Sequence, residues 1–380
     1  EDADEIADGS AADCNGNGLI DSCEIADGSA ADINLDGILD ECQETLKFSV
    51  PGGFGTIADA IDAAPDGSVI SLAAGTYNEA VDFGSKNLVL QGDPSDPASV
   101  VLSGSGLDTS VVSIRGGQDG SSMLTGVQIR FGTVGSPLPN QPTSRVGGAI
   151  FIQNSSPLVQ DCIFTFNLSG FGGAVYLLGG AAEIRSCAFI GNDATTDGGA
   201  VFSQGSNGLI AGCTMSSNDA VNHGGGIKVV QGDLEIVDTQ VSGGGADQGG
   251  GLYWFASAET LPLRVTGCTF TDNTASKVGG GIKSRGGFPG VDLMDTTVCD
   301  NFPDEIDGEY IDNGGNTLCI CVADFTGDGV VSGADLGLLL GAWGACDPGA
   351  SCFADLTGDG VVTGADLGLL LGAWGVCVDP

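Results

Sequence analysis

The sequence predicts an all-β protein: a solenoid of short stacked strands, with small calcium-binding loop-helix modules at its termini. Three observations support this prediction. Between residues 47 and 319, Gly-Gly motifs followed by apolar residues recur about every 25–30 positions. The last 60 residues contain one 24-residue segment written twice with three conservative changes, and the first 44 contain an acidic segment repeated with a period of 19. Such periods are typical of repeat architectures, in which each unit is stable only beside its neighbours.

The charge distribution excludes several classes of partner. The 380 residues include 50 acidic and 11 basic side chains. Residues 1–44 carry 14 acids and no Lys or Arg, and residues 320–380 carry eight Asp and no base. Because a phosphate backbone needs a basic surface, we expect no nucleic-acid partner, and an anionic membrane surface is disfavoured for the same reason. No apolar run approaches the roughly 18 residues of a membrane span.

Residues 1–44 are predicted to form the first domain, two calcium loops. The motifs DCNGNGLIDSCE and DINLDGILDECQ place oxygen-bearing side chains around a Gly at the sixth position, where a sharp turn is needed. The expected ligands are Asp13, Asn15, Asn17, Leu19, Asp21 and Glu24 in the first loop, and Asp32, Asn34, Asp36, Ile38 and Asp40 in the second. The segment is similar to thrombospondin type 3 repeats, which are organised around calcium ions, although Gln43 replaces the last carboxylate. A disordered acidic linker is the alternative.

Residues 45–319 are predicted to form coils of three short strands, about ten coils in a rod about 50 Å long. The Gly pairs stand where the chain turns tightly. A second series of motifs, such as CIFTFN and CAFIGN, ends on Asn residues that suit the corners and can hydrogen-bond to the next coil. A helix capped by Thr56 is expected to close the first coil. Cys162, Cys187, Cys213 and Cys268 occupy one repeat position, and we expect an inward stack of free thiols.

These motifs resemble a known fold. The strand pattern looks like a right-handed parallel β-helix of the pectate-lyase-like superfamily. The Gly-Gly-Ala-Ile and Phe-x-x-Asn alternation resembles the repeats of polymorphic outer-membrane proteins. The resemblance covers about 270 residues and implies a fold, but little about function.

Residues 320–380 are predicted to form a tandem of EF-hand-type calcium units. Each copy has oxygen donors at loop positions 1, 3, 5, 9 and 12, Gly at position 6, and an apolar helix afterwards. The expected ligands are Asp324, Thr326, Asp328, Val330, Ser332 and Asp335 in the first copy, and Asp355, Thr357, Asp359, Val361, Thr363 and Asp366 in the second, with Val330 and Val361 at position 7 offering their backbone carbonyls. This resembles a type I dockerin, which implies a cohesin-like partner. The Thr at position 3 and the Gly-Ala pairs at positions 10 and 11 depart from that family.

The remaining cysteines indicate disulfides and an oxidising, calcium-rich, extracellular setting, the cell surface or surroundings of a bacterium. We expect Cys321 to pair with Cys346 and Cys352 with Cys377, because each pair brackets one copy of the tandem. We expect Cys299 and Cys319 to close the far end of the rod. The pairing of Cys14, Cys23 and Cys42 stays open.

Two functions compete. The first is a structural or adhesive protein whose calcium-stabilised ends bind other subunits or a scaffold, with a homo-oligomer or filament as one form. The second is a polysaccharide-active or glycan-binding, lyase-like β-helix that is tethered to a scaffold through its dockerin-like module; as an enzyme it would be a polysaccharide lyase or a glycoside hydrolase. For the second, the candidate sugar contacts are Tyr253, Trp254, Lys228 and Lys283. The single His223 stands in a Gly-rich turn without a Gly-x-Ser-x-Gly elbow or a metal motif, so a surface position is expected and the sequence favours a non-enzymatic role.

Overall fold

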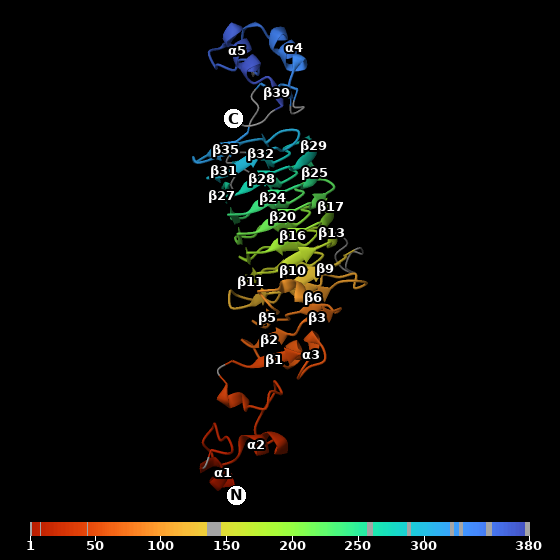
Figure 1. Cartoon of the computed structure of the whole chain (residues 1–380), viewed down its shortest axis with the longest axis vertical. Coiled ribbons are helices and arrows are strands. Elements are labelled where there is room, and N and C mark those ends of the chain that lie inside the picture. Colours follow the sequence, from red (N-terminus) through yellow and green to blue (C-terminus); the bar gives the residue numbers. More distant parts are fainter. Residues whose placement is uncertain are drawn as a thin grey trace.

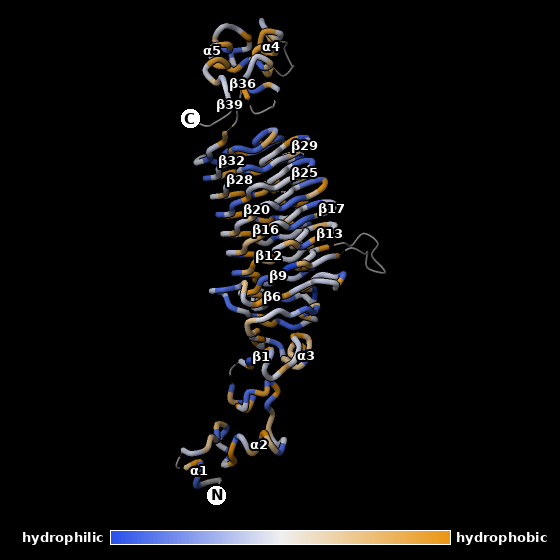
Figure 2. The backbone as a smooth tube through the Cα atoms, turned by 45° about the vertical axis from the view of Figure 1, so that its right-hand side comes forward, coloured by the Kyte–Doolittle hydropathy of each residue, from blue (hydrophilic) through white to orange (hydrophobic). Residues whose placement is uncertain are grey.

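The computed structural model describes residues 2–7, 9–43, 45–134, 146–256, 261–286, 290–319, 323–326, 330–346 and 352–376. The chain forms a rod of stacked coils, with the N-terminal helices beyond one end and helices α4 and α5 beyond the other (Figure 1). Hydrophobic and hydrophilic residues alternate along each coil (Figure 2). This alternation gives every coil one face for the core and one for solvent. Within the described ranges, no helix is both long and apolar enough to cross a membrane.

Three long parallel sheets build the rod, as the repeats predict. Sheet A comprises β1 (Lys47–Val50), β2 (Val69–Leu72), β5 (Val89–Gln91), β8 (Met123–Thr125), β11 (Leu158–Gln160), β15 (Glu183–Arg185), β19 (Leu209–Ala211), β23 (Glu235–Val237), β27 (Leu263–Thr266), β31 (Val291–Met294) and β34 (Tyr310–Asp312). Sheet B comprises β3 (Gly75–Tyr77), β6 (Val100–Ser103), β9 (Gln128–Arg130), β12 (Ile163–Thr165), β16 (Ala188–Ile190), β20 (Thr214–Ser216), β24 (Gln240–Ser242), β28 (Thr269–Thr271), β32 (Thr297–Cys299) and β35 (Thr317–Leu318). Sheet C comprises β4 (Val81–Asp82), β7 (Val112–Ile114), β10 (Ile150–Gln153), β14 (Val175–Leu178), β18 (Val201–Gln204), β22 (Ile227–Val230), β26 (Leu252–Phe255), β30 (Ile282–Arg285) and β33 (Ile306–Asp307).

A fourth sheet corrects the prediction of three strands per coil. Sheet D lies between sheets B and C in the chain and comprises β13 (Leu168–Phe171), β17 (Asp193–Asp197), β21 (Asp219–Ala220), β25 (Gly245–Gln248) and β29 (Thr274–Val278). Its segments are polar and Gly-rich, so they carry no alternating apolar signal. They become strands because the coil below presents a parallel partner in register.

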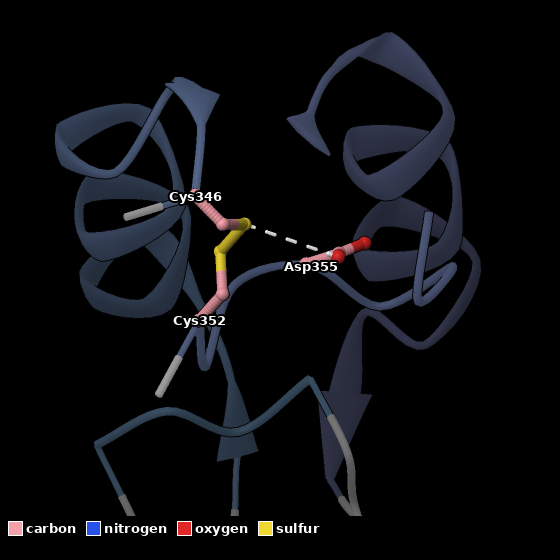
Figure 3. Close-up of side chains that lie close together, drawn as sticks. All are labelled: Cys346, Cys352 and Asp355. Atoms are coloured by element: carbon pink, nitrogen blue, oxygen red, sulfur yellow. Dashed lines mark hydrogen bonds between the residues drawn. A yellow bond between two sulfur atoms is a disulfide. The ribbon is translucent and has the colours of Figure 1, made fainter. Parts of the chain in front are cut away.

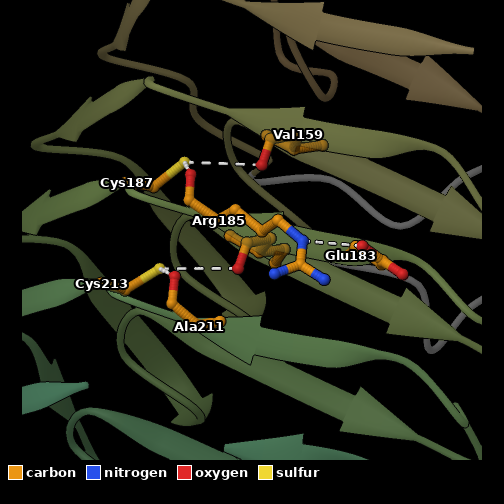
Figure 4. Close-up of polar contacts among 7 residues, drawn as sticks. Val159, Glu183, Arg185, Cys187, Ala211 and Cys213 are labelled. Atoms are coloured by element: carbon orange, nitrogen blue, oxygen red, sulfur yellow. Dashed lines mark hydrogen bonds and ion pairs between the residues drawn. The ribbon is translucent and has the colours of Figure 1, made fainter. Parts of the chain in front are cut away.

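The core is one continuous apolar column. Side chains of the same repeat position stack on each other, as Phe164 and Phe189 do with ring centroids 4.6 Å apart. The predicted stack of free thiols is confirmed: Cys162, Cys187, Cys213 and Cys268 are buried and unpaired. Figure 4 shows two of them, Cys187 and Cys213, on successive coils. Each thiol lies 3.2–3.4 Å from the carbonyl oxygen two residues earlier, that of Arg185 or Ala211.

An amide ladder crosses the same coils. The side chains of Asn167, Asn192, Asn218, Asn273 and Asn301 are buried. Within the ladder, the side-chain amide of one Asn donates to the side-chain oxygen of the next, as Asn192 Nδ2 does to Asn218 Oδ1 at 2.9 Å. The same amide donates to a backbone carbonyl of the preceding coil, as Asn192 Nδ2 does to Phe164 O at 3.0 Å. Gly244 interrupts the ladder: it lacks the side-chain amide but keeps the backbone hydrogen bond of the other rungs, since its N–H donates to Asn273 Oδ1 at 2.9 Å as that of Asn192 does to Asn218 Oδ1. The left-handed residue of each corner is not the Asn, as expected, but the residue before it, for example Ser217 with φ 52°.

Both ends of the rod are closed. Helix α3 (Ile57–Ala63) begins after Thr56, whose hydroxyl accepts from Asp59 N as predicted, and buries Ile57 and Ile61 against the first coils. At the other end, a disulfide joins Cys299 to Cys319, which confirms that pairing. Beyond the first coil lie α1 (Asp2–Ala7), α2 (Asp21–Asp27) and the short helix Asp40–Cys42. Beyond the last coil lie α4 (Gly333–Gly341), α5 (Gly364–Gly372) and the paired strands β36 (Val330–Val331), β37 (Gly344–Ala345), β38 (Val361–Val362) and β39 (Gly375–Val376). A further short helix, Pro97–Ser99, lies within the rod.

Candidate functional site

The corner between sheets D and C brings two rows of side chains together on the outside of the rod. The first Gly of each Gly-Gly motif has positive φ, for example 68° at Gly198, a conformation that other residues rarely adopt. After this corner, alternate side chains of each sheet C strand point away from the core, and the ones nearest the corner form one row. We call this row the outer row; its register is Phe151, Tyr176, Phe202, Lys228, Tyr253, Lys283 and Asp307.

The first half of the outer row is aromatic. Phe151, Tyr176 and Phe202 form a buried cluster separate from the main core. Tyr176 and Phe202 stack with centroids 5.1 Å apart, and Phe171 from the end of sheet D meets Phe202 edge-on at 5.4 Å. Sheet D therefore covers this part of the outer row with apolar side chains.

The second half of the outer row is ionic. Asp197, at the end of β17, is only about a tenth exposed at its side chain. Its carboxylate accepts from His223 Nδ1 at 2.6 Å and from Lys228 Nζ at 3.0 Å. Lys228 Nζ also lies 5.0 Å from the ring centroid of Tyr253, and the His223 ring lies 4.4 Å from it. We call Asp197, His223, Lys228 and Tyr253 the ionic cluster.

The surroundings of the ionic cluster are charged but balanced. Burial lowers the pKa of Lys228, and the negative charge of Asp197 opposes this shift. In neighbouring coils, Lys283 pairs with Asp307, and Lys277 pairs with Asp247 at 2.5 Å. Each of these lysines has one aspartate, and Arg285 adds a further positive charge that also lowers the pKa of Lys228, so this surface lacks the strong negative charge of the chain as a whole, which is −39.

Three of the four predicted sugar contacts lie together, and one does not. Lys228, Tyr253 and Lys283 share the outer row, but Lys228 is 8% exposed and Tyr253 only 2%, so of these three only Lys283 is partly open to solvent. Trp254 points into the core and is 1% exposed, so its prediction as a sugar contact is wrong. The reason is the two-residue period of a strand, which turns Trp254 inward once Tyr253 points outward.

His223 and Asp197 were not expected in a site. His223 was predicted to be a surface turn residue, but its side chain is 24% exposed and hydrogen-bonded to a buried carboxylate. A signal was present in the repeats: Asp197 and His223 both directly precede a Gly-Gly motif. Equal repeat positions stack in a solenoid, so the two residues had to be neighbours.

In the N-terminal loops, the first Asp of each motif is hydrogen-bonded within its own loop. In each loop the first Asp accepts from the amides of positions 5 and 6: Asp13 from Asn17 and Gly18, Asp32 from Asp36 and Gly37. In the first loop, Asn17 Nδ2 also donates a hydrogen bond to Glu24 Oε1 at 2.7 Å.

Two buried oxygens test whether a cation fits there. Glu24 is 4% exposed and Asn34 is 2% exposed. Glu24 Oε2 and Asn34 Oδ1 have no hydrogen-bond partner among the described residues. A carboxylate and an amide oxygen that are buried without donors suit a hard cation such as Ca²⁺. The donor set therefore fits the ion, and Glu24 and Asn34 are among the residues that would hold it.

The C-terminal loops also bring their predicted ligands together. Thr326 Oγ1 lies 3.1 Å from Asp324 and 3.0 Å from Asp335, and Thr357 has the same relation to Asp355 and Asp366, at 3.2 Å and 3.0 Å. Asp335 and Asp366 are fully buried. Burial opposes ionisation of Asp335, but amide and hydroxyl donors of Ser332 and Thr326 lower its pKa to about 2. Asp359 accepts from Val361 N at 2.9 Å, whereas Asp328 lies outside the described residues.

Ser332 and Thr363 have a structural role as well as their predicted place in the loops. Each caps the helix that follows, α4 or α5, and forms a capping box with Asp335 or Asp366. The side-chain oxygens of Ser332 and Thr363 accept from the amides of Ala334 and Ala365, both at 3.2 Å. These hydrogen bonds fix the start of each helix beside its loop.

The disulfides correct one prediction. Cys346 pairs with Cys352, across the connection between the two copies, and not with Cys321 (Figure 3). Consequently Cys352 does not pair with Cys377; Cys321 and Cys377 lie outside the described residues. The two copies pack with equivalent residues facing each other, which brings the end of one copy beside the start of the next. Cys346, Cys352 and Asp355 lie close together, but two disulfide sulfurs offer no thiolate to a metal.

At the N-terminus, Cys14 pairs with Cys42 and Cys23 is free and exposed.

Comparison with known proteins finds one family model that matches part of the chain and several solved structures similar to it. Residues 118–298 match the family model described as the right handed beta helix region. Similar solved structures include pectin methylesterase PemA from Erwinia chrysanthemi (15% identity, TM-score 0.37, covering 64% of this chain and 80% of that one). Another is the deglycosylated pectin methylesterase from Aspergillus niger (14%, 0.37, 71% and 87%). A third is the catalytic unit of a GH87 alpha-1,3-glucanase from Streptomyces thermodiastaticus (14%, 0.35, 72% and 69%).

These similarities concern the fold alone. No curated protein matches the chain. The parallel register of sheets A, B and C, the repeating corners and the matched segment agree with one another. The middle of this chain is a right-handed parallel β-helix.

Proposed function

We propose that this protein binds a neutral polysaccharide along the outer row of sheet C, at the ionic cluster. The observation that carries the proposal is the carboxylate of Asp197, held between His223 and Lys228 beside the ring of Tyr253. In the coils before it, the same positions of the outer row are filled by the aromatic side chains of Phe151, Tyr176 and Phe202, none of which carries a charge at neutral pH. Partly buried charges cost desolvation free energy that an apolar repeat avoids, so a role in ligand binding explains why they are here.

A polysaccharide suits this surface for two reasons. The outer row repeats polar and aromatic groups at the spacing of parallel strands, roughly 4.8 Å, along a straight axis. The side chains there that reach solvent are those of His223, Lys283 and Asp307, 24%, 15% and 34% exposed, and an extended sugar chain would contact these across successive coils. The one-to-one pairing of lysines with aspartates leaves hydrogen-bonding groups without a strong net charge, which favours hydroxyl groups over carboxylates as the ligand chemistry.

We expect the binding to depend on the ionic cluster. The measurement is titration calorimetry with hexasaccharides of glucose, xylose, mannose and galacturonic acid. His223→Ala and Lys283→Ala should each weaken the affinity for a neutral hexasaccharide at least tenfold. Arg264→Ala is the control, because Arg264 is ion-paired with Glu235 on the outside of sheet A. Equal affinities in all four proteins, or binding of the galacturonic acid hexamer alone, contradict the proposal.

Catalysis at the same place is the second candidate function. The hydrogen bond of Asp197 to Nδ1 orients the His223 ring and leaves Nε2 for a proton transfer. The same hexasaccharides, incubated with the protein and assayed for new reducing ends, separate binding from cleavage. Release that His223→Ala abolishes makes the protein an enzyme; no release leaves it a binding protein.

We also propose that the terminal modules hold Ca²⁺ and attach the rod outside the cell, to another subunit or a cohesin-like scaffold. The C-terminal module exposes the same apolar side chains twice. Leu340 and Leu371 are both 52% exposed, and Trp343 and Trp374 are both 50% exposed. The module has no basic residue, so a partner with an apolar and basic surface complements it. Disulfides in both terminal modules agree with an extracellular location.

Removal of calcium should loosen the ends and leave the rod intact. A chelator should make residues 1–44 and the C-terminal module sensitive to protease, while the melting temperature of the β-helix stays within about 2 °C, because its core is apolar. Glu24→Gln should weaken calcium binding by the N-terminal module, and Glu5→Gln, which removes the same charge from α1, serves as the control. Protease patterns that are identical with calcium and with chelator would falsify the calcium proposal.

A further inference from the structure

Two phenylalanines occupy an unfavourable place on the surface. Phe131 and Phe166 directly precede the ladder position at the corner between sheets B and D, and both have left-handed backbone, with φ 56° and 53°. In the following coils, the same corner is made by Gly191, Ser217 and Gly243. Glycine and small polar residues tolerate this conformation, whereas a bulky side chain is strained in it.

The two rings are only partly covered by the residues they pack against. Phe131 is 42% exposed and Phe166 is 60% exposed. Exposure of an aromatic ring and a strained backbone both reduce stability, and the corner forms without either ring in later coils. Strain that occurs twice at one repeat position, on the surface, therefore indicates a contact with something outside the chain.

The geometry around the rings forms a stacking surface with polar neighbours. The rings are nearly parallel, 14° apart, with centroids separated by 6.2 Å. The guanidinium of Arg130 lies 5.3 Å from the centroid of Phe131. The Phe166 ring extends over Gly191, where an added Cβ would lie 3.0 Å from it. Because Gly191 has no side chain, that residue leaves the ring uncovered.

Polar groups border the same rings. The guanidinium of Arg130 lies over the Phe131 ring; its Nε is buried and so not itself open to a ligand, and it has no hydrogen-bond partner among the described residues. Gln128 Nε2 donates to Thr165 Oγ1 at 3.3 Å on the adjoining face of sheet B. Aromatic edges and faces beside a guanidinium, an amide and a hydroxyl match the two kinds of surface on a sugar ring, its C–H faces and its hydroxyl groups.

We infer that Phe131, Phe166 and Arg130 form a second carbohydrate subsite, which takes a pyranose ring of a neutral polysaccharide. The inference takes the class of ligand from the proposed function. Its residues are separate from the ionic cluster and lie at the opposite end of the sheet D strands. A protein partner is disfavoured, because two rings and their exposed neighbours Leu168 and Ile190 make a much smaller surface than a stable protein interface needs.

Phe166→Gly tests the subsite, because glycine removes the ring and relieves the backbone strain together. We expect the melting temperature of the full chain to stay within about 2 °C of the wild type or to rise. We expect the affinity for the neutral hexasaccharide that binds best among those of glucose, xylose and mannose to fall at least tenfold. Phe166→Trp, which retains a ring, should bind that hexasaccharide within threefold of the wild type. A lower melting temperature with unchanged affinity shows that the ring is structural and overturns the inference.

Hydrogen exchange with and without that hexasaccharide separates this subsite from the ionic cluster. Protection around residues 130–133 and 165–168 supports the subsite, and its absence overturns it. Affinity lost in Phe166→Gly but kept in His223→Ala contradicts the proposed function at the ionic cluster and leaves the subsite standing. The reverse pattern contradicts the subsite alone. A wild-type chain that binds none of the hexasaccharides overturns both.

Discussion

Replacement of Asn192 by Ala should destabilise the β-helix by roughly 3–5 kcal/mol. Asn192 is fully buried, and its Oδ1 accepts from the Asn167 backbone N–H and side-chain amide at 3.1 and 2.9 Å. Its Nδ2 donates to Phe164 O and to Asn218 Oδ1. Truncation therefore leaves donors and acceptors of three coils unsatisfied, and each unpaired buried group costs about 1–3 kcal/mol.

The measurement is thermal and denaturant unfolding of the full chain, followed by circular dichroism. Asn207→Ala is the matched control, because Asn207 is exposed and its side chain accepts one hydrogen bond, from Asp233 N at 2.9 Å. We expect its effect to stay below about 1 kcal/mol. If the two variants unfold at the same denaturant concentration, the ladder does not hold the coils together.

Replacement of Gly250 by Ala should cost about 3 kcal/mol or more, for a steric reason. An added Cβ would lie 2.6 Å from Gly280 O, 2.6 Å from Thr274 O and 2.7 Å from Thr274 N. All three atoms belong to the backbone of the next coil, so no side chain can rotate away. The strands must separate, which breaks the parallel pairing of β25 with β29 and of β26 with β30.

The melting temperature of the β-helix should fall by roughly 6–12 °C in the Gly250 variant. Gly120→Ala provides the comparison within the same domain, because its Cβ would meet one atom, Ser156 O, at 4.0 Å. That variant should melt within about 2 °C of the wild type. A Gly250 variant that melts with the Gly120 variant would show that neighbouring coils are not in close contact at this corner.

The stacked coils were predictable from the sequence because each repeat faces the same physical problem. A short strand cannot satisfy its backbone or bury its side chains alone, so glycines for the corners, Asn for the ladder and Cys for the core recur at fixed spacings. Sheet D was not predictable in this way. Segments such as Asp193–Asp197 and Gly245–Gln248 are polar, and their extended form depends on the neighbouring coil.

Side-chain direction and partner choice depended on the tertiary structure in the same way. The aromatic run at Tyr253 and Trp254 does not reveal which ring points outward. The choice follows from the register of β26 beside β22 and β30. Equal spacing likewise suggested a disulfide within each copy of the tandem, but the packing of the two copies places Cys346 beside Cys352. A pairing is decided by distance in space, which spacing along the chain does not specify.

The sequence by itself determined that this chain is a rod of stacked parallel coils with acidic, oxygen-rich loops beyond both ends. It also specified which positions of the rod recur. Only the tertiary structure decided that Asp197, His223 and Lys228 form one hydrogen-bonded group, and that Phe131 and Phe166 are exposed and strained. Repetition along the chain reveals the period of a solenoid, because equal positions must stack. The contacts across a corner depend on how sharply each coil turns, and that angle exists only once the coils have folded against each other.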